Sequence, residues 1–98
     1  MDKQTFTVEN SEAEMRFFVR EEEEVAILEY RLRDDLIALM HTLVPAKLEG
    51  RGLASTLAHH ALEWAKEKGR RVVVYCPFVA AYLKGHPEYM PLVVSLHA

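Results

Sequence analysis

Residues 45–55, Pro-Ala-Lys-Leu-Glu-Gly-Arg-Gly-Leu-Ala-Ser, decide the fold. Before this stretch, apolar residues alternate as they do in β-strands, and after it they recur at helical spacing. Gly50 and Gly52 therefore lie between a strand and a helix. Glycine permits positive φ and close backbone approach to a ligand, and the free N–H groups of a helix start favour an anion. The stretch predicts either a tight turn or a phosphate cradle, to which Arg51 would add a fixed positive charge.

The residues upstream of this stretch read as four strands. Period-two or β-branched and aromatic patterns cover residues 5–8, 15–19, 25–32 and 36–44. The acidic run 21–24 reads as a solvated turn between the second and third strands. Because the breaks between them are short, these strands are expected to form an antiparallel meander.

The residues downstream predict a helix, a strand and a second helix. The first helix begins after Gly52 and ends at Gly69, a residue type typical of helix C-termini. Residues 71–75 are a β-branched strand candidate, and Pro77 can start the last helix. The expected fold is α/β (α+β-type), a mixed twisted sheet of order ββββ-α-β-α. A right-handed crossover would make its fourth and fifth strands parallel neighbours.

Composition narrows the functional classes. The chain has 98 residues, 12 Lys plus Arg and 15 Asp plus Glu, for a net charge of −3. This length suits a single domain, residues 1–98, and the charge gives no overall attraction to nucleic acid. The lone Cys76 excludes an internal disulfide, and the adjacent His59 and His60 cannot both face one metal ion. With no long apolar run, we expect a cytoplasmic protein without metal or membrane contact.

Three segments together resemble a known family. Residues 47–52 resemble motif A of the Gcn5-related N-acetyltransferases, Gln/Arg-x-x-Gly-x-Gly/Ala, with Lys47 at the first position. Residues 41–45 and the run from Cys76-Pro77-Phe78 to Tyr89 resemble the minimal stand-alone subgroup of that family, whose members have about the length of this chain. That subgroup lacks the helices that usually wall the acceptor side, so the acceptor site should be open or completed by a partner.

The resemblance implies a site for acetyl-CoA or coenzyme A. In the family, motif A backbone N–H groups hold the pyrophosphate, and the pantetheine lies where the fourth and fifth strands splay apart. Carried over by position, the cofactor-binding residues would be Leu43, Val44, Leu48, Gly50, Arg51, Gly52, Leu53, Ala54, Ser55, Tyr75, Cys76 and Pro77.

Three residues are candidates for catalysis, each with a structural alternative. Cys76 at a helix start could be a nucleophile or orient the acceptor, or it could be a small buried thiol. His41 could be a general base or a structural histidine. Tyr82, on the last helix, could protonate the leaving thiolate as tyrosines in the family do, or it could pack on the sheet. A backbone N–H of Tyr75 or Leu43 could stabilise the oxyanion.

Two functions follow from this reading. The first is an acetyl-CoA-dependent N-acetyltransferase that acts on an amine of an unidentified peptide or small molecule. The alternative is an acyl-CoA-binding sensor or interaction module without efficient catalysis, which the missing acceptor wall favours. The chain could be a monomer or a homodimer. Its apolar tail, residues 90–96, could add an edge strand within the chain or across a dimer.

Overall fold

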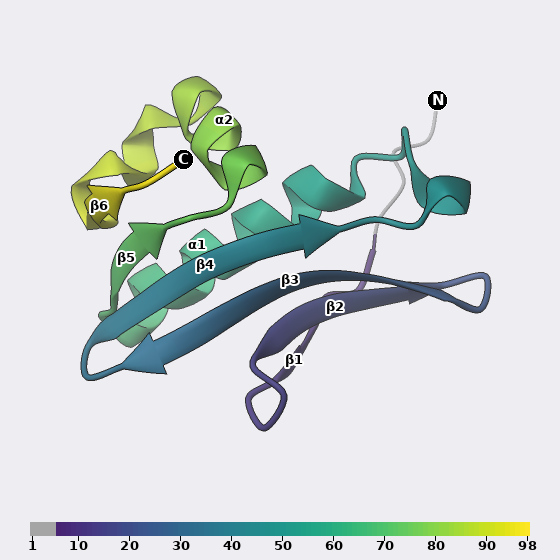
Figure 1. Ribbon diagram of the computed structural model, residues 1–98, viewed down its shortest axis with the longest axis horizontal. Coiled ribbons are helices and arrows are strands. Elements are labelled where there is room, and N and C mark those ends of the chain that lie inside the picture. The colour runs from purple at the N-terminus through teal and green to yellow at the C-terminus, as the bar shows by residue number, and fades with distance from the viewer. Residues whose placement is uncertain (1–5) are drawn as a thin grey trace.

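The computed structural model describes residues 6–98 and shows one sheet of six strands in the order β1-β2-β3-β4-β5-β6 (Figure 1). In chain order the elements are β1 (Glu9–Ser11), β2 (Arg16–Glu21), β3 (Glu24–Arg33), β4 (Leu36–Leu43), the 3₁₀ turn η1 (Ala46–Leu48), α1 (Leu53–Lys68), β5 (Arg71–Val74), α2 (Pro77–Gly85), the 3₁₀ helix η2 (Pro87–Leu92) and β6 (Val93–Leu96). The expected α/β fold with parallel fourth and fifth strands is confirmed.

The expected first strand is misplaced. Residues 6–8 have no strand structure, position 5 lies outside the described residues, and the strand begins at Glu9. Phe6 and Val8 pack against the core all the same. The alternation in the sequence therefore reflects the burial of these side chains and not strand pairing, because pairing with β2 begins only at Glu9. At the other end, the tail forms β6 beside β5 in the same chain.

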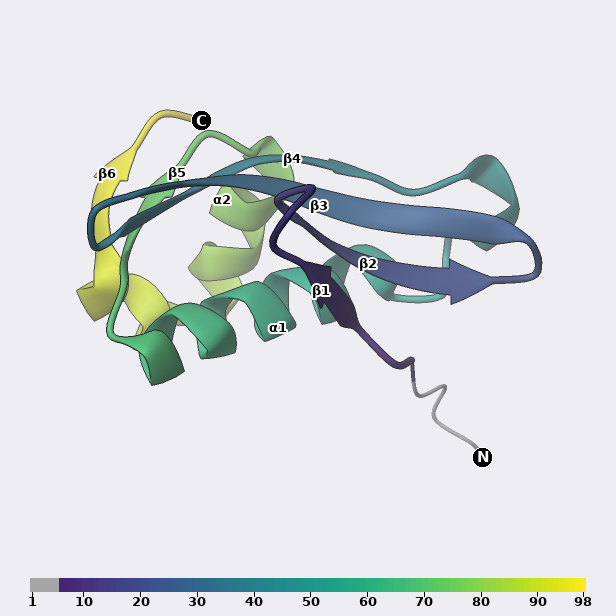
Figure 2. The same cartoon turned by 90° about the horizontal axis from the view of Figure 1, so that it is seen from below.

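Both helices cover the same face of the sheet. β1 to β4 are antiparallel neighbours, whereas β4 pairs in parallel with β5, and β5 with β6. The two parallel connections step in the same direction across the sheet, so crossovers of the same hand place α1 and α2 on one side. Figure 2 shows both helices beneath the sheet. Between residues 6 and 98, no helix covers the opposite face, which we call the helix-free face.

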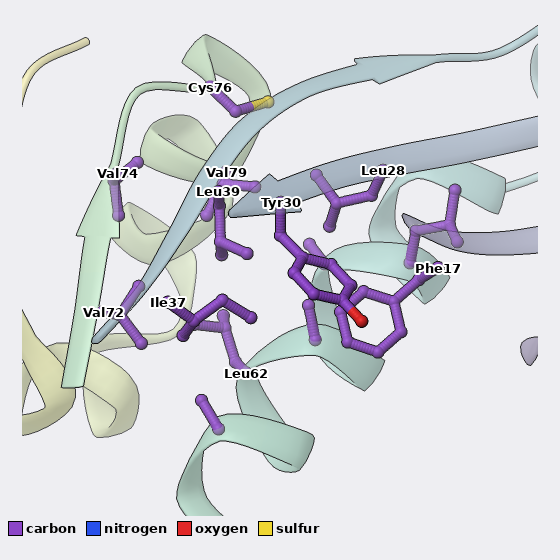
Figure 3. Packing of buried hydrophobic residues seen from close by; sticks show 14 of the residues in the cluster. Phe17, Leu28, Tyr30, Ile37, Leu39, Leu62, Val72, Val74, Cys76 and Val79 are labelled. Carbon is purple, nitrogen blue, oxygen red and sulfur yellow. The ribbon is translucent and has the colours of Figure 1, made fainter. Parts of the chain in front are cut away.

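The core lies between the sheet and α1. Strand alternation directs Phe17 and Leu28 towards the helix, where they meet Leu57 and Leu62, all fully buried. Tyr30 joins this layer beside Phe17 (Figure 3) and donates a hydrogen bond to Asn10 Oδ1 at 2.6 Å. Each such fully buried Leu or Phe side chain stabilises the fold by roughly 1.5–3 kcal/mol.

β4 and β5 diverge in the middle of the sheet. Their pairing runs only from Leu36 opposite Arg71 to Leu39 opposite Val74, although β4 continues to Leu43. On the other side of β4, Leu39 pairs with Tyr30 and His41 with Glu29, so Met40 has no partner on β3. An extra residue of this kind is a β-bulge, which bends the strand and increases its twist. The bulge therefore coincides with the point where β4 leaves β5.

Candidate functional site

The turn between β4 and α1 needs both of its glycines. Gly50 has φ 83° and Gly52 has φ 81°, in the left-handed region. A Cβ at either position would meet no atom within 4 Å, so conformation and not space demands glycine. Another residue there would cost roughly 1–2 kcal/mol. Leu48, fully buried, anchors the preceding η1 turn to the core, so the glycine backbone is held in place.

The N-terminus of α1 is left open. Gly52 is its N-cap residue and accepts hydrogen bonds from the backbone N–H and the hydroxyl of Thr56. Within the described chain no side chain caps this end, and the first turn holds no acidic residue. The N–H groups of Leu53, Ala54 and Ser55 precede the helical hydrogen-bond pattern and lack helical acceptors. Together with the helix dipole they form a site for an anion.

A cavity of about 230 Å³ lies over this helix end. Its walls are Val44, Leu48, Glu49, Gly50, Gly52, Leu53, Ala54, Ser55 and Phe78. Most of these are residues expected from the sequence to bind the cofactor. Phe78, at the start of α2, was not among them, although it belongs to the Cys-Pro-Phe segment that carried the resemblance. We call this cavity the cradle.

The splay beside the cradle exposes apolar side chains. Leu43 at the end of β4 is 57% exposed and Phe78 at the start of α2 is 37% exposed. Pro77, directly before Phe78, is also exposed. Tyr75 after β5 is 44% exposed, and its ring stacks on His97 with centroids 4.6 Å apart. Large apolar side chains left in water where two strands separate are typical of a surface that an apolar ligand covers.

Arg51 is engaged away from the cradle. Its Nη1 lies 2.8 Å from Glu22 Oε2 in the β2–β3 turn, and Nη2 lies 3.4 Å from the carbonyl oxygen of Lys47. The hydrogen bond and charge of Arg51 lower the pKa of the Glu22 carboxyl. The expected fixed charge is therefore neutralised by a partner that lies far away in the sequence.

Cys76 lies on the helix side of the splay (Figure 3). It is 1% exposed, and its Sγ lies 3.3 Å from Thr42 Oγ1 on β4. The backbone N–H groups of Tyr75 and Cys76 both donate to the carbonyl oxygen of Leu39, at 2.9 and 3.0 Å. The Tyr75 amide considered for the oxyanion therefore already has an acceptor. Met40, which no sequence pattern singled out, is the residue without a β3 partner at this point.

His41 lies on the opposite face from Cys76. Thr42 pairs with the buried Leu28, whereas His41 pairs with Glu29, so successive side chains of β4 point to opposite faces. His41 Nε2 lies 3.0 Å from Glu29 Oε1, and the imidazole is 54% exposed on the helix-free face. The structure therefore does not bring Cys76 and His41 together as a nucleophile and its base. Glu29, which no sequence pattern singled out, places a carboxylate beside His41 on this face.

Tyr82 belongs to a cluster in the helix layer. Its ring stacks on His86 with centroids 3.9 Å apart, and its hydroxyl lies 3.5 Å from His59 Nδ1 on α1. Tyr89 from η2 joins this cluster. Its hydroxyl donates a hydrogen bond to Glu63 and lies 3.1 Å from His59 Nδ1. Burial raises the pKa of Tyr82, so its hydroxyl is protonated at neutral pH. These contacts fasten α2 and η2 to α1.

The fold and the glycine turn define a protein of the acetyltransferase class. The sequence pattern of the GCN5-related N-acetyl-transferase family matches residues 16–92, so the chain belongs to this family. Acyl transfer is the activity that this membership supports.

One curated protein is similar to about half of the chain, and one solved structure is similar to nearly all of it. Protein NATD1 of Bos taurus is 36% identical over 52 residues, which are 53% of this chain and 46% of that protein. The chain thus spans about half the length of this curated relative. The NMR solution structure of a GCN5-like protein from Staphylococcus aureus matches with a TM-score of 0.71 at 24% identity, over 98% of this chain and 93% of that one, and shows the same fold.

Residues 6–98 carry neither a cluster of metal ligands nor a membrane-spanning helix. No group of three His, Cys, Asp or Glu side chains is arranged as metal ligands would be. None of the helices in this range has the length and apolar character needed to cross a bilayer.

Proposed function

We propose that this chain, acting as one domain over residues 1–98, transfers an acetyl group from acetyl-CoA to an amine. The observation that carries the proposal is the uncapped N-terminus of α1, which opens into the cradle beside the β4–β5 splay. A cofactor with a pyrophosphate and a long, weakly polar arm needs these two features side by side.

The pyrophosphate would bind to backbone groups. The N–H groups from Gly52 to Ser55 would donate to its oxygens, and the helix dipole would add a favourable charge interaction. Because these donors belong to the main chain, a lysine at position 47 in place of the family's Gln or Arg leaves them intact. Arg51 would strengthen phosphate binding only after leaving Glu22.

The pantetheine arm would lie in the splay. Val44 after β4 and Phe78 on α2, which line the cradle, would contact it on the helix side. Leu43, Tyr75 and Pro77 would border the gap itself. Burying these exposed apolar groups contributes binding free energy, about 25 cal/mol per Å² removed from water. Holding the thioester in one place also provides the proximity that a bimolecular reaction otherwise lacks.

The thioester carbonyl would be polarised at the bulge. Met40 replaces Tyr75 as the proposed backbone donor, because the Tyr75 amide is bonded to Leu39 and Met40 lies outside the β3 ladder. A donor aimed at the oxygen where charge develops lowers the barrier to acyl transfer.

Transfer would be direct, without an acetylated enzyme. The amine nitrogen forms a bond to the carbonyl carbon, and the bond from that carbon to sulfur breaks. Cys76 is a poor nucleophile in this setting, because it is buried, bonded to Thr42 and on the other face from His41. We propose that Cys76 shapes the end of the gap, and that Tyr82 holds α2 against α1.

The second candidate function is an acyl-CoA-binding module without efficient chemistry. The helix-free face favours it, because nothing among the described residues walls an acceptor there. One experiment separates the two functions: acetyl-CoA is titrated by calorimetry, and its consumption is then followed as glycinamide, a small primary amine, is added. An enzyme binds acetyl-CoA and consumes it in proportion to the amine. A sensor binds it equally well, with consumption at the buffer rate.

A further inference from the structure

The helix-free face carries, beside the splay, a pair of groups able to move a proton. Glu29 on β3 and His41 on β4 stand opposite each other in the ladder, with Nε2 and Oε1 3.0 Å apart. Glu29 is 21% exposed at its side chain, far less than the imidazole at 54%. The carboxylate is therefore held against the sheet while the ring faces solvent. Arg16 Nη2, 3.9 Å from Glu29 Oε2, flanks the carboxylate on its other side.

This contact determines which ring nitrogen is free. A carboxylate only accepts hydrogen bonds, so Nε2 of a neutral His41 carries the ring proton and donates a hydrogen bond to Glu29. Nδ1 is then the nitrogen with a lone pair, available to remove a proton from another molecule.

The pair stands beside the point where the strands separate. His41 directly follows Met40, the bulge residue, and Leu43, two residues further on, borders the splay. The bulge is also what aims His41 outward: without the extra residue, the side chains after Leu39 would exchange faces.

Resting on the proposed acetyl transfer, we infer that the acceptor amine approaches the splay from the helix-free face, where His41 removes its proton and Glu29 positions His41. The cofactor then occupies the cradle on the helix side, and the two substrates meet through the gap between the strands. His41 is the catalytic residue of the pair, and Glu29 is a positioning residue.

The protons balance in this scheme. An ammonium acceptor gives one proton to His41 Nδ1, and the resulting amine attacks the thioester carbonyl. As the tetrahedral intermediate collapses, the bond from carbon to sulfur breaks, and the second proton leaves nitrogen and ends on the departing sulfur. His41 returns its proton to solvent. The products are the N-acetylated acceptor, free coenzyme A and one proton.

The test uses the full chain with acetyl-CoA and glycinamide. His41→Ala and Glu29→Gln are compared with Glu9→Gln, which removes a carboxylate paired with Arg20 instead of a histidine. We expect kcat to fall roughly 10²-fold in His41→Ala and roughly tenfold in Glu29→Gln, with acetyl-CoA affinity unchanged, and Glu9→Gln to match the parent. Added imidazole should restore part of the rate to His41→Ala, and less of it to the His41→Ala, Glu29→Gln double variant.

Each outcome separates this inference from the proposed function. If the parent binds acetyl-CoA but the His41 and Glu29 variants react at its rate, the inference is overturned and the cofactor site stands. The same holds if the parent binds acetyl-CoA and does not accelerate acetylation of glycinamide. Lost activity without imidazole rescue, in a variant that still binds acetyl-CoA, would assign His41 a structural role. If the parent does not bind acetyl-CoA, the proposed function itself fails.

Discussion

The guanidinium of Arg51 lies 2.8 Å from the Glu22 carboxylate, so the arginine between the two cradle glycines is held by the β2–β3 turn. A phosphate and a carboxylate bind the same N–H groups of a guanidinium, so they compete for it. Replacing Glu22 with glutamine should release Arg51 and remove a negative charge near the cradle. We expect coenzyme A to bind roughly two- to fivefold more tightly, as measured by calorimetry, a change in keeping with an exposed ion pair.

Glu23→Gln is the matched control for this prediction. It removes the same charge one position further along the turn, from a side chain without a bond to Arg51 among the described residues. Equal gains in the two variants would show that Arg51 has no separate part in phosphate binding.

The contact between Cys76 and Thr42 predicts direct transfer. If the thiol is not a nucleophile, Cys76→Ala should keep turnover within about threefold of the parent, since the chemistry passes from thioester to amine in one transfer. Incubation of the parent with acetyl-CoA alone should leave its intact mass unchanged. An added acetyl mass that is present in the parent and absent in Cys76→Ala would contradict direct transfer.

Tyr89 is expected to be the most important hydroxyl in the helix layer. It is 4% exposed and donates to Glu63, which raises the pKa of the phenol beyond the effect of burial alone. Tyr89→Phe should cost about 1–2 kcal/mol of unfolding free energy and lower Tm by roughly 4–8 °C per kcal/mol. Tyr82→Phe should cost less, because its hydroxyl lies 3.5 Å from His59. Thermal unfolding of both variants checks the order, and the reverse order would count against it.

His60 gives the fold a pH dependence with a defined sign. Burial, with a smaller effect from the charge of His59, lowers its pKa below the ordinary 6.5. Because the unfolded chain then binds more protons than the native one, stability is greatest above the ordinary pKa. It falls as the pH drops towards the folded value. Tm should therefore fall less between pH 7.5 and 5.5 in His60→Gln than in the parent or in His97→Gln. Equal falls in all three would refute the assignment.

Local patterns were enough to predict most elements. The β-branched run 71–75 became β5, and the helical spacing after Gly52 became α1, which ends at Gly69 in the left-handed conformation. The glycine turn and its cavity were also predictable, because positive φ and an open helix end depend on residues close together in the chain.

The face of the sheet to which each site residue points could not be predicted in this way. Whether His41 or Thr42 points to the helices depends on the bulge at Met40, and a shift of one residue in register exchanges the faces of a strand. The pairs His41–Glu29 and Arg51–Glu22 join residues from different strands and turns. No spacing along the chain signals such pairs, since the sheet brings them together.

The central claim is that the open end of α1 binds the pyrophosphate of coenzyme A, and Ser55→Glu tests it most directly. A glutamate at this third helical position should keep or raise helix stability, because acidic residues are favoured at helix N-termini. Ser55→Gln is the neutral control of the same shape. In a calorimetric titration with coenzyme A, we predict that Ser55→Glu binds about tenfold or more weakly than Ser55→Gln, while its Tm does not fall. Equal affinity in all three proteins, or no binding by the parent, would contradict the account.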